Sequence, residues 1–209
     1  MNRRQFLKLT GATAVGFVIG CKKDKKHRLY IPQTPTDVAS AMEHMIDNYQ
    51  DVKTVVGEMA PAEDVVGSID IVSTLNSEIE NKHGEGSVDY AVFDRELLEE
   101  YPFAYNLISV GNRDNNQITN LIALSFNPNL CRSPQWFYEN EGEDLGELKG
   151  LIQFVDNRND TYSIVATGRT GLEVRKACAV LADFRNHNLH GKTIYAKGEL
   201  GDLTTEIVD

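Results

Sequence analysis

Apolar side chains recur along the chain at two different spacings, and the alternation of these spacings predicts an α/β fold. Residues 37–50 carry apolar side chains three and four positions apart, which predicts an amphipathic helix. Residues 52–57 form a short β-rich run that ends at a glycine, and Pro61 then fits the first turn of a second helix. We assign the buried stripe of this second helix to Val65, Ile69, Val72 and Ile79.

The middle of the chain repeats this strand-then-helix order. Residues 87–93 alternate between apolar and polar side chains and predict a second strand, which joins the first through a right-handed parallel crossover. Residues 106–111 predict a third strand, and residues 117–124 predict the helix that follows its polar loop. Residues 125–149 break the periodicity with prolines and glycines, as a functional loop or an excursion from the domain does.

The last third of the chain completes the pattern. An apolar segment at 150–156 and a polar turn lead to a strand over 162–167, and residues 172–186 predict a helix. A strand at 193–196 closes the series. We therefore expect a three-layer, doubly wound, Rossmann-like and mostly parallel sheet of about five strands with about four main helices. Residues 37–209 are expected to form a single domain.

The first twenty residues are typical of an export signal. Arg3 and Arg4 precede Phe-Leu-Lys, the arrangement that a twin-arginine translocase reads in proteins exported already folded. The weakly apolar run at 9–20 is shorter than the roughly twenty residues that a transmembrane helix needs. It ends at Cys21, and the small residue before that cysteine suits cleavage and lipidation. The sequence thus predicts a signal peptide at 1–20 and an extracytoplasmic, membrane-anchored lipoprotein at the cell surface.

The role of Cys21 has alternatives. Ordinary cleavage, or an uncleaved N-terminal anchor, would leave this cysteine without a function. The basic residues at 22–28 could sit on anionic lipid headgroups, at on the order of 1 kcal/mol per charge, or form a solvated linker. We interpret 21–36 as a lipidated basic tether, since one acyl chain and a basic patch together give stable attachment. Membrane lipid is then a partner through Cys21.

The net charge of the chain limits the classes of molecule that it is expected to bind. The formal net charge of −10 becomes −13 without residues 1–20, which carry three basic residues and no acid. Such an acidic surface disfavours nucleic acid as a partner. It permits weak divalent-cation binding, although scattered carboxylates are usually a solvated face. We expect no other cofactor.

The cysteines are too few for a disulfide framework or a cysteine-rich metal or iron–sulfur site, because only Cys131 and Cys178 accompany Cys21. Cys178 shares an apolar helical stripe with Leu181 and is expected to be a small core residue. A Cys131–Cys178 bridge in an oxidising exterior is the alternative.

High-specificity catalytic signatures are missing: the sequence has no Gly-x-Ser-x-Gly elbow, P-loop, Gly-x-Gly-x-x-Gly or His-Glu-x-x-His motif. Weaker candidates remain. Gly168 and Gly171 lie between a strand and a helix, where backbone N–H groups could hold an anion, although a tight turn also needs such glycines. His187 and His190 have no third metal ligand in view and suit a helix C-cap.

Acidic residues follow the first predicted strand, at the edge where open α/β sheets bind ligands. Glu58, Glu63 and Asp64 could therefore hold a ligand or a cation, or they could act only as partners of the helix dipole. No histidine or cysteine is near them in sequence to act as a base or a nucleophile, so no catalytic residue is assigned.

Residues 55–75, VVGEMAPAEDVVGSIDIVSTL, resemble a segment that recurs in archaeal surface-layer (S-layer) proteins. A second region resembles later strand–helix pairs of that family, and it comprises 107–111, 162–168, 174–184 and 189–193. Together these matches cover roughly half of the mature chain, counted along the printed sequence. The resemblance implies the α/β fold and a structural, non-catalytic role at the cell surface, with cell-envelope or S-layer proteins, including copies of itself, as partners.

Two departures from the family bear on lattice formation. Gly111-Asn112-Arg113 stands where the family tends to carry Gly-Gly-Pro, and only residues 94–104 occupy the place of large insertions in full-length lattice proteins. The resemblance therefore supports the fold better than it supports a lattice. A ligand-binding lipoprotein of a transporter or receptor system is the alternative function, with an exported enzyme as a third.

Overall fold

The computed structural model describes residues 34–89, 91–126 and 149–208 of the chain. Residues Thr34–Asp209 form one compact unit. Most of the segment 125–149 lies outside the described residues, as do the predicted signal peptide and most of the tether. The residues that the sequence nominates for export, lipidation and disulfide pairing also lie outside them, namely Arg3, Arg4, Cys21 and Cys131.

The described residues form a mixed seven-stranded sheet with the order β2-β1-β3-β5-β4-β6-β7. Strands β2, β1, β3 and β5 are parallel, whereas β4, β6 and β7 each pair antiparallel with their neighbours. The strands are β1 (Val52–Val56), β2 (Val92–Phe93), β3 (Asn106–Val110), β4 (Gly150–Asp156), β5 (Tyr162–Thr167), β6 (Thr193–Glu199) and β7 (Asp202–Ile207).

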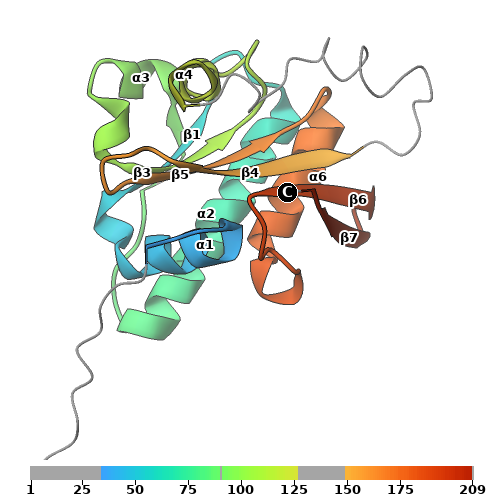
Figure 1. Cartoon of the computed structure of the whole chain (residues 1–209), viewed down its shortest axis with the longest axis horizontal. Helices are drawn as coiled ribbons and strands as arrows, with labels where there is room; N and C mark the ends of the chain where they lie inside the picture. The colour runs from blue at the N-terminus through green and yellow to red at the C-terminus, as the bar shows by residue number, and fades with distance from the viewer. Residues whose placement is uncertain (1–33, 90, 127–148, 209) are drawn as a thin grey trace, which may run out of the picture. The chain divides into compact units, whose positions relative to one another are not determined.

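Helices cover both faces of this sheet (Figure 1). One face carries α1 (Val38–Asp47), α2 (Ala62–His83) and α6 (Gly171–Ala182), and the other carries α3 (Asp94–Leu98) and α4 (Gln117–Phe126). Short 3-10 turns are η2 (Tyr49–Asp51), η3 (Pro102–Ala104) and η4 (Phe184–Asn186). The α/β class predicted from the sequence is confirmed, but the sheet has seven strands in mixed directions rather than about five that are mostly parallel.

The alternation of side chains along each strand divides the core in two. Ile108 and Val110 of β3 pack toward α1, α2 and α6, whereas Leu107 of the same strand packs toward α4. The larger core therefore lies under the three helices of the first face, and the smaller one lies under α3 and α4. Apolar burial on both faces explains why the parallel strands are almost continuously apolar.

The predicted sheet is incomplete in three places. β2 comprises only Val92–Phe93 rather than 87–93, because Val88 packs into the core as a loop residue and donates its N–H to the Asn76 side chain at 2.7 Å. β4 is a full antiparallel strand, and β7 was not predicted at all. β7 is an exposed edge strand that places only Leu203 against the core, so its apolar signal is weak.

The predicted stripe of α2 is wrong at Ile69, which is 51% exposed. In the N-terminal half of α2, small residues form the buried face because α2 packs closely on α6 there. A Cβ atom on Gly67 would lie 2.7 Å from both the Cβ and the Sγ of Cys178. A prediction that follows only the large apolar side chains therefore assigns the exposed face with Ile69 to the core, instead of the neighbouring face with Gly67. The buried residues of α2 are Asp64, Gly67, Ser68, Ile71, Val72, Leu75 and Ile79.

Local side-chain contacts define the first and the last long helices. Asp37 caps α1 in a capping box with Ser40, whose backbone N–H lies 2.7 Å from Asp37 Oδ1. Cys178 and Leu181 are fully buried in the larger core, as their helical stripe predicts. Cys178 is a free thiol. Burial raises its pKa strongly, so this thiol is unreactive in the folded protein.

The order of the first three strands creates a topological switch point, the place in the sheet where the connections from neighbouring strands go to opposite faces. The chain leaves β1 through α2 on one face to reach β2, and then returns through α3 on the other face to reach β3. The carboxyl ends of β1 and β3, which lie side by side, thus face loops that diverge to opposite faces. Open α/β sheets bind their ligands at such a point.

Candidate functional site

The switch point between β1 and β3 is filled by the side chain of Asn116. Its Nδ2 atom donates to the backbone oxygen of Val110 at 2.8 Å and reaches that of Val55 at 3.4 Å. Its Oδ1 atom accepts the backbone N–H groups of Ile118 at 2.9 Å and Thr119 at 3.1 Å. One buried amide therefore joins the two strand ends and also caps α4.

Asp94 ties the same region together from the opposite side. Its Oδ1 atom accepts the backbone N–H groups of Glu58 at 3.0 Å and Arg95 at 2.8 Å, and its Oδ2 atom accepts that of Gln117 at 2.8 Å. The side chain is 2% exposed. The N-terminus of α4, which attracts anions because its N–H groups are unpaired and its dipole is positive, is thus bound to a carboxylate of the chain itself.

The backbones at this edge approach so closely that only glycine fits. A Cβ atom on Gly57 would lie 1.6 Å from the carbonyl oxygen of Asn115. Gly111 has a φ of 116°, and a Cβ atom there would lie 2.8 Å from Asn115 Oδ1. Both strand ends therefore pack closely against the 112–116 loop.

Asp64 is the most perturbed carboxyl group of the predicted acidic edge. It is fully buried in the first turn of α2, and Asn115 Nδ2 donates to its Oδ2 atom at 3.2 Å. Its Oδ1 atom has no hydrogen-bond partner. Burial raises its pKa to about 6. The hydrogen bond from Asn115 opposes this rise, and the nearby Glu63 carboxylate adds to it.

The predicted anion position at Gly168–Gly171 is taken by Glu173. The Oε2 atom of Glu173 accepts the backbone N–H groups of Arg169 at 2.6 Å and Thr170 at 2.9 Å. Its Oε1 atom accepts from the Arg169 guanidinium at 2.7 Å. Thr170 and Glu173 form the capping box of α6. An external anion would have to displace this buried carboxylate.

The structure brings some of the nominated residues together and separates others. A Cβ atom on Gly171 would lie 3.0 Å from Glu63 Oε2, so the starts of α2 and α6 are in contact, with Asp64 next to them. The Glu58 side chain instead faces α3, where its carboxylate lies 3.9 Å from the Arg95 guanidinium.

The two candidate histidines lie beside different acids. His187 is 3.7 Å from Asp183, and His190 is 3.5 Å from Asp37. Within the described ranges, no group of three or more histidine, cysteine, aspartate or glutamate residues is arranged to hold a metal ion.

Sequence reasoning missed the residues that close this edge. Glu173 had a local signal, because Thr-x-x-Glu before an apolar run is a capping box. Asn116 also directly precedes its helix and is a common N-cap type. Asp94 had no such signal, because its partner Gln117 is 23 residues away and its partner Glu58 is 36 residues away.

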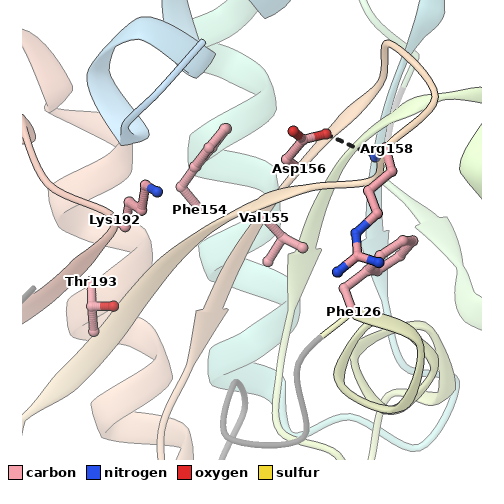
Figure 2. A pocket seen from close by; sticks show the side chains of 7 residues that line it. All are labelled: Phe126, Phe154, Val155, Asp156, Arg158, Lys192 and Thr193. Atoms are coloured by element: carbon pink, nitrogen blue, oxygen red, sulfur yellow. Dashed lines mark hydrogen bonds between the residues drawn. The ribbon is translucent and has the colours of Figure 1, made fainter.

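One cavity of about 310 Å³ lies at the opposite end of the sheet, beyond the last residue pair of β4 and β6 (Figure 2). Figure 2 shows Lys192 and Phe154 on one side of β4, and Phe126 and Arg158 on the other. Arg158 has a φ of 62°, and Asp156 Oδ1 accepts its backbone N–H at 2.7 Å. The rim thus carries both signs of charge on exposed side chains.

Another cavity, of about 420 Å³, lies between α2 and the edge strand β2. Its lining is mainly apolar and includes Val65, Ile69 and Val72 of α2 together with Phe93 of β2. Ile69 and Phe93 are 51% and 44% exposed. We call this feature the α2–β2 groove.

No protein-family model matches the chain, and no curated protein matches its sequence. The resemblance to S-layer proteins therefore stays a prediction. None of the described helices combines the length and apolar character that crossing a bilayer requires.

Proposed function

We propose that the protein is an exported, lipid-anchored domain of the cell surface that works by associating with envelope components, as S-layer proteins do. The observation that carries the proposal is the closure of the carboxyl edge. Asn116, Asp94 and Glu173 occupy the helix N-termini and strand ends where an enzyme of this architecture would hold its substrate. The chain's own side chains thus occupy the N-termini of α4 and α6, which favours a structural role over turnover.

The fold supports the same proposal. Strands β2, β1, β3 and β5 form a parallel half with crossovers on both faces, as in a doubly wound, Rossmann-like sheet. The antiparallel strands β4, β6 and β7 extend that half. The segments that carry the S-layer resemblance at 107–111 and 162–168 contribute the adjacent parallel strands β3 and β5 of this half.

The anchor in this proposal consists of Arg3 and Arg4 for export and Cys21 for lipid attachment, followed by the basic residues of the tether. Lipid would hold the acidic domain at the outer surface of the membrane, where its partners are proteins of the envelope. Divalent cations are expected to bind weakly and to reduce repulsion between acidic surfaces.

The test is cosedimentation of the purified Cys21→Ser protein with isolated cell envelopes, compared with vesicles made from lipids of the same envelopes. Removal of the lipid ensures that any binding comes from the folded domain. Saturable recovery with envelopes and little recovery with vesicles is expected. Equal amounts in the supernatant with and without envelopes would contradict the proposal.

The cavity in Figure 2 favours a second candidate, a ligand-binding lipoprotein. Its volume of about 310 Å³ is at the lower end of the range for small-molecule sites, roughly 300–1,000 Å³. A thermal-shift screen with small anionic compounds tests it, with Arg158→Ala as the matched variant. A stabilising compound whose effect disappears in Arg158→Ala would support this candidate.

A further inference from the structure

The two outer strands of the sheet, β2 and β7, present surfaces that complement each other. At one edge, β2 is only two residues long, and no strand among the described residues lies beyond it. There the half-buried Val65 and the exposed Ile69 of α2 line the α2–β2 groove, with the buried Val72 at its base. The α2–β2 groove is the space that an additional strand would fill. At the other edge, β7 is six residues long and ends beside two exposed apolar side chains, Ile207 and Val208.

We propose that β7 of a second copy of this chain adds to β2 as the next strand, with its apolar face in the α2–β2 groove. This inference rests on the proposed function, which is action by association, and it names one partner and one surface. Main-chain pairing at a free sheet edge, with side-chain pockets that select alternate residues, is an established mode of recognition.

Strand direction fits this pairing. β6 is antiparallel to β4, which is antiparallel to β5, so β6 runs with β1 and β2, and β7 runs against them. A copy placed so that its sheet continues that of its neighbour therefore brings β7 antiparallel to β2. Antiparallel pairing is slightly more stable per residue than parallel pairing.

The faces and lengths also match. Leu203 packs against the core under α6, and Ile207 lies four residues on, so it points to the same face as α6 and α2. In a continuous sheet this face of β7 meets the apolar side chains of α2. The six residues of β7 span about 20 Å. Residues 65–76 of α2, which line the groove, rise about 17 Å along the helix.

The proposed alignment also brings opposite charges of the two copies together, at the carboxyl end of β2. Arg95, just beyond the end of β2, has a side chain that is 73% exposed. Glu199 ends β6 and Asp202 begins β7, and these two exposed acidic residues pair across the hairpin, next to its turn. Since β6 and β2 end at the same edge of the sheet, the acidic turn of one copy comes next to Arg95 of the other.

The pairing is head-to-tail, because each copy uses a different surface on each side. A heterologous contact of this kind forms rings or open chains rather than a closed two-fold dimer. The net charge of −10 opposes association at long range, so added salt should strengthen it by screening.

Sedimentation velocity of the full chain tests the proposal, with Cys21→Ser in every sample so that lipid does not cause association. The wild-type surface should form species of increasing mass as concentration and salt rise. Ile69→Glu, which blocks the groove, and Ile207→Glu, which blocks β7, should each remain monomeric. A mixture of these two variants retains one intact groove and one intact β7, and it should form dimers and nothing larger.

Leu124→Glu is the control, because this substitution adds the same charge at a site away from both proposed surfaces. Leu124 is 64% exposed on α4, at the other face of the sheet. It should assemble as the wild type does, and circular dichroism should show all variants folded. Monomeric wild type at all concentrations and salts would overturn the inference, as would dimers in either single variant alone. If the wild type binds envelopes yet stays monomeric, the proposed function stands and this inference fails.

Discussion

Asp94 accepts the backbone N–H of Gln117 at 2.8 Å, and this bond joins the start of α3 to the start of α4. The same carboxylate also accepts the backbone N–H groups of Glu58 and Arg95. A single buried acid thus satisfies donors from three segments that meet at the switch point. The anion that other proteins bind at such a place is replaced here by a residue of the chain.

Replacement of Asp94 by alanine is expected to lower the free energy of unfolding by about 3 kcal/mol or more. The reason is that three backbone donors lose a charged acceptor and at least one stays buried without a partner. Chemical denaturation measures the change. Glu96→Ala, two residues away on the exposed side of α3, is the matched control and should change stability by less than about 0.5 kcal/mol.

Asp64 should make stability depend on pH. Its pKa rises from 3.8 to about 6 on folding, so the folded state binds the proton more tightly than the unfolded state does. The stability contributed by the neutral form is complete below about pH 4 and is lost as pH rises through about 6. A shift of this size corresponds to about 3 kcal/mol.

The Asp64→Asn variant tests this claim, because it keeps the shape of the side chain without the charge. Urea melts from pH 4 to pH 7 should show a smaller fall in stability for Asp64→Asn than for the wild type, and higher stability at pH 7. Parallel curves for the two proteins would show that Asp64 is not the group responsible. Asp114→Asn, an exposed acid in the neighbouring loop, should leave the curve unchanged.

Ile69 and Leu181 should respond very differently to truncation. Leu181→Ala removes a fully buried side chain and should cost about 2–5 kcal/mol. Ile69→Ala removes a side chain that is 51% exposed and should cost less than about 1 kcal/mol in a denaturant melt. Similar losses for both variants would mean that α2 presents a different face to the core.

The contrast between these two residues shows what the sequence could predict. Stripes of large apolar side chains locate a helix face when the packing surface is itself large and apolar, as around Leu181 in α6. On α2 the contact with α6 is made through Gly67, which carries no hydropathy signal. Exposed β7 was missed for a related reason, because a strand that buries little has little alternation.

For the candidate site too, some residues are indicated by local sequence patterns and others are not. Glu63, Asp64 and Gly171 come together at one edge because strands β1 and β5 are each followed by a glycine-containing turn and a helix, which the sequence pattern indicates. The pattern could not show that Asp94 and Asn115 come back to that edge from distant positions. Whether an edge is open or closed depends on such long-range contacts, and local patterns do not encode them.

Export and anchoring give a further prediction. Replacement of both Arg3 and Arg4 by lysine should leave unprocessed precursor in the cytoplasm, because the twin-arginine translocase reads the arginine pair. Cys21→Ser should release the mature protein from the membrane or block its processing. Fractionation with a high-salt wash measures this result. Persistence of Cys21→Ser in the washed membrane fraction would show that lipid is not the anchor.

The protein is expected to associate with the envelope without turning over a substrate. The most direct measurement compares the wild type with the triple variant Glu58→Gln, Glu63→Gln, Asp64→Asn in two assays: hydrolysis of envelope glycans and peptides, and calcium-dependent sedimentation. Neither protein should hydrolyse these substrates, and the amount of wild type that sediments should increase with calcium. Hydrolysis by the wild type that disappears in the triple variant would instead identify the protein as an enzyme.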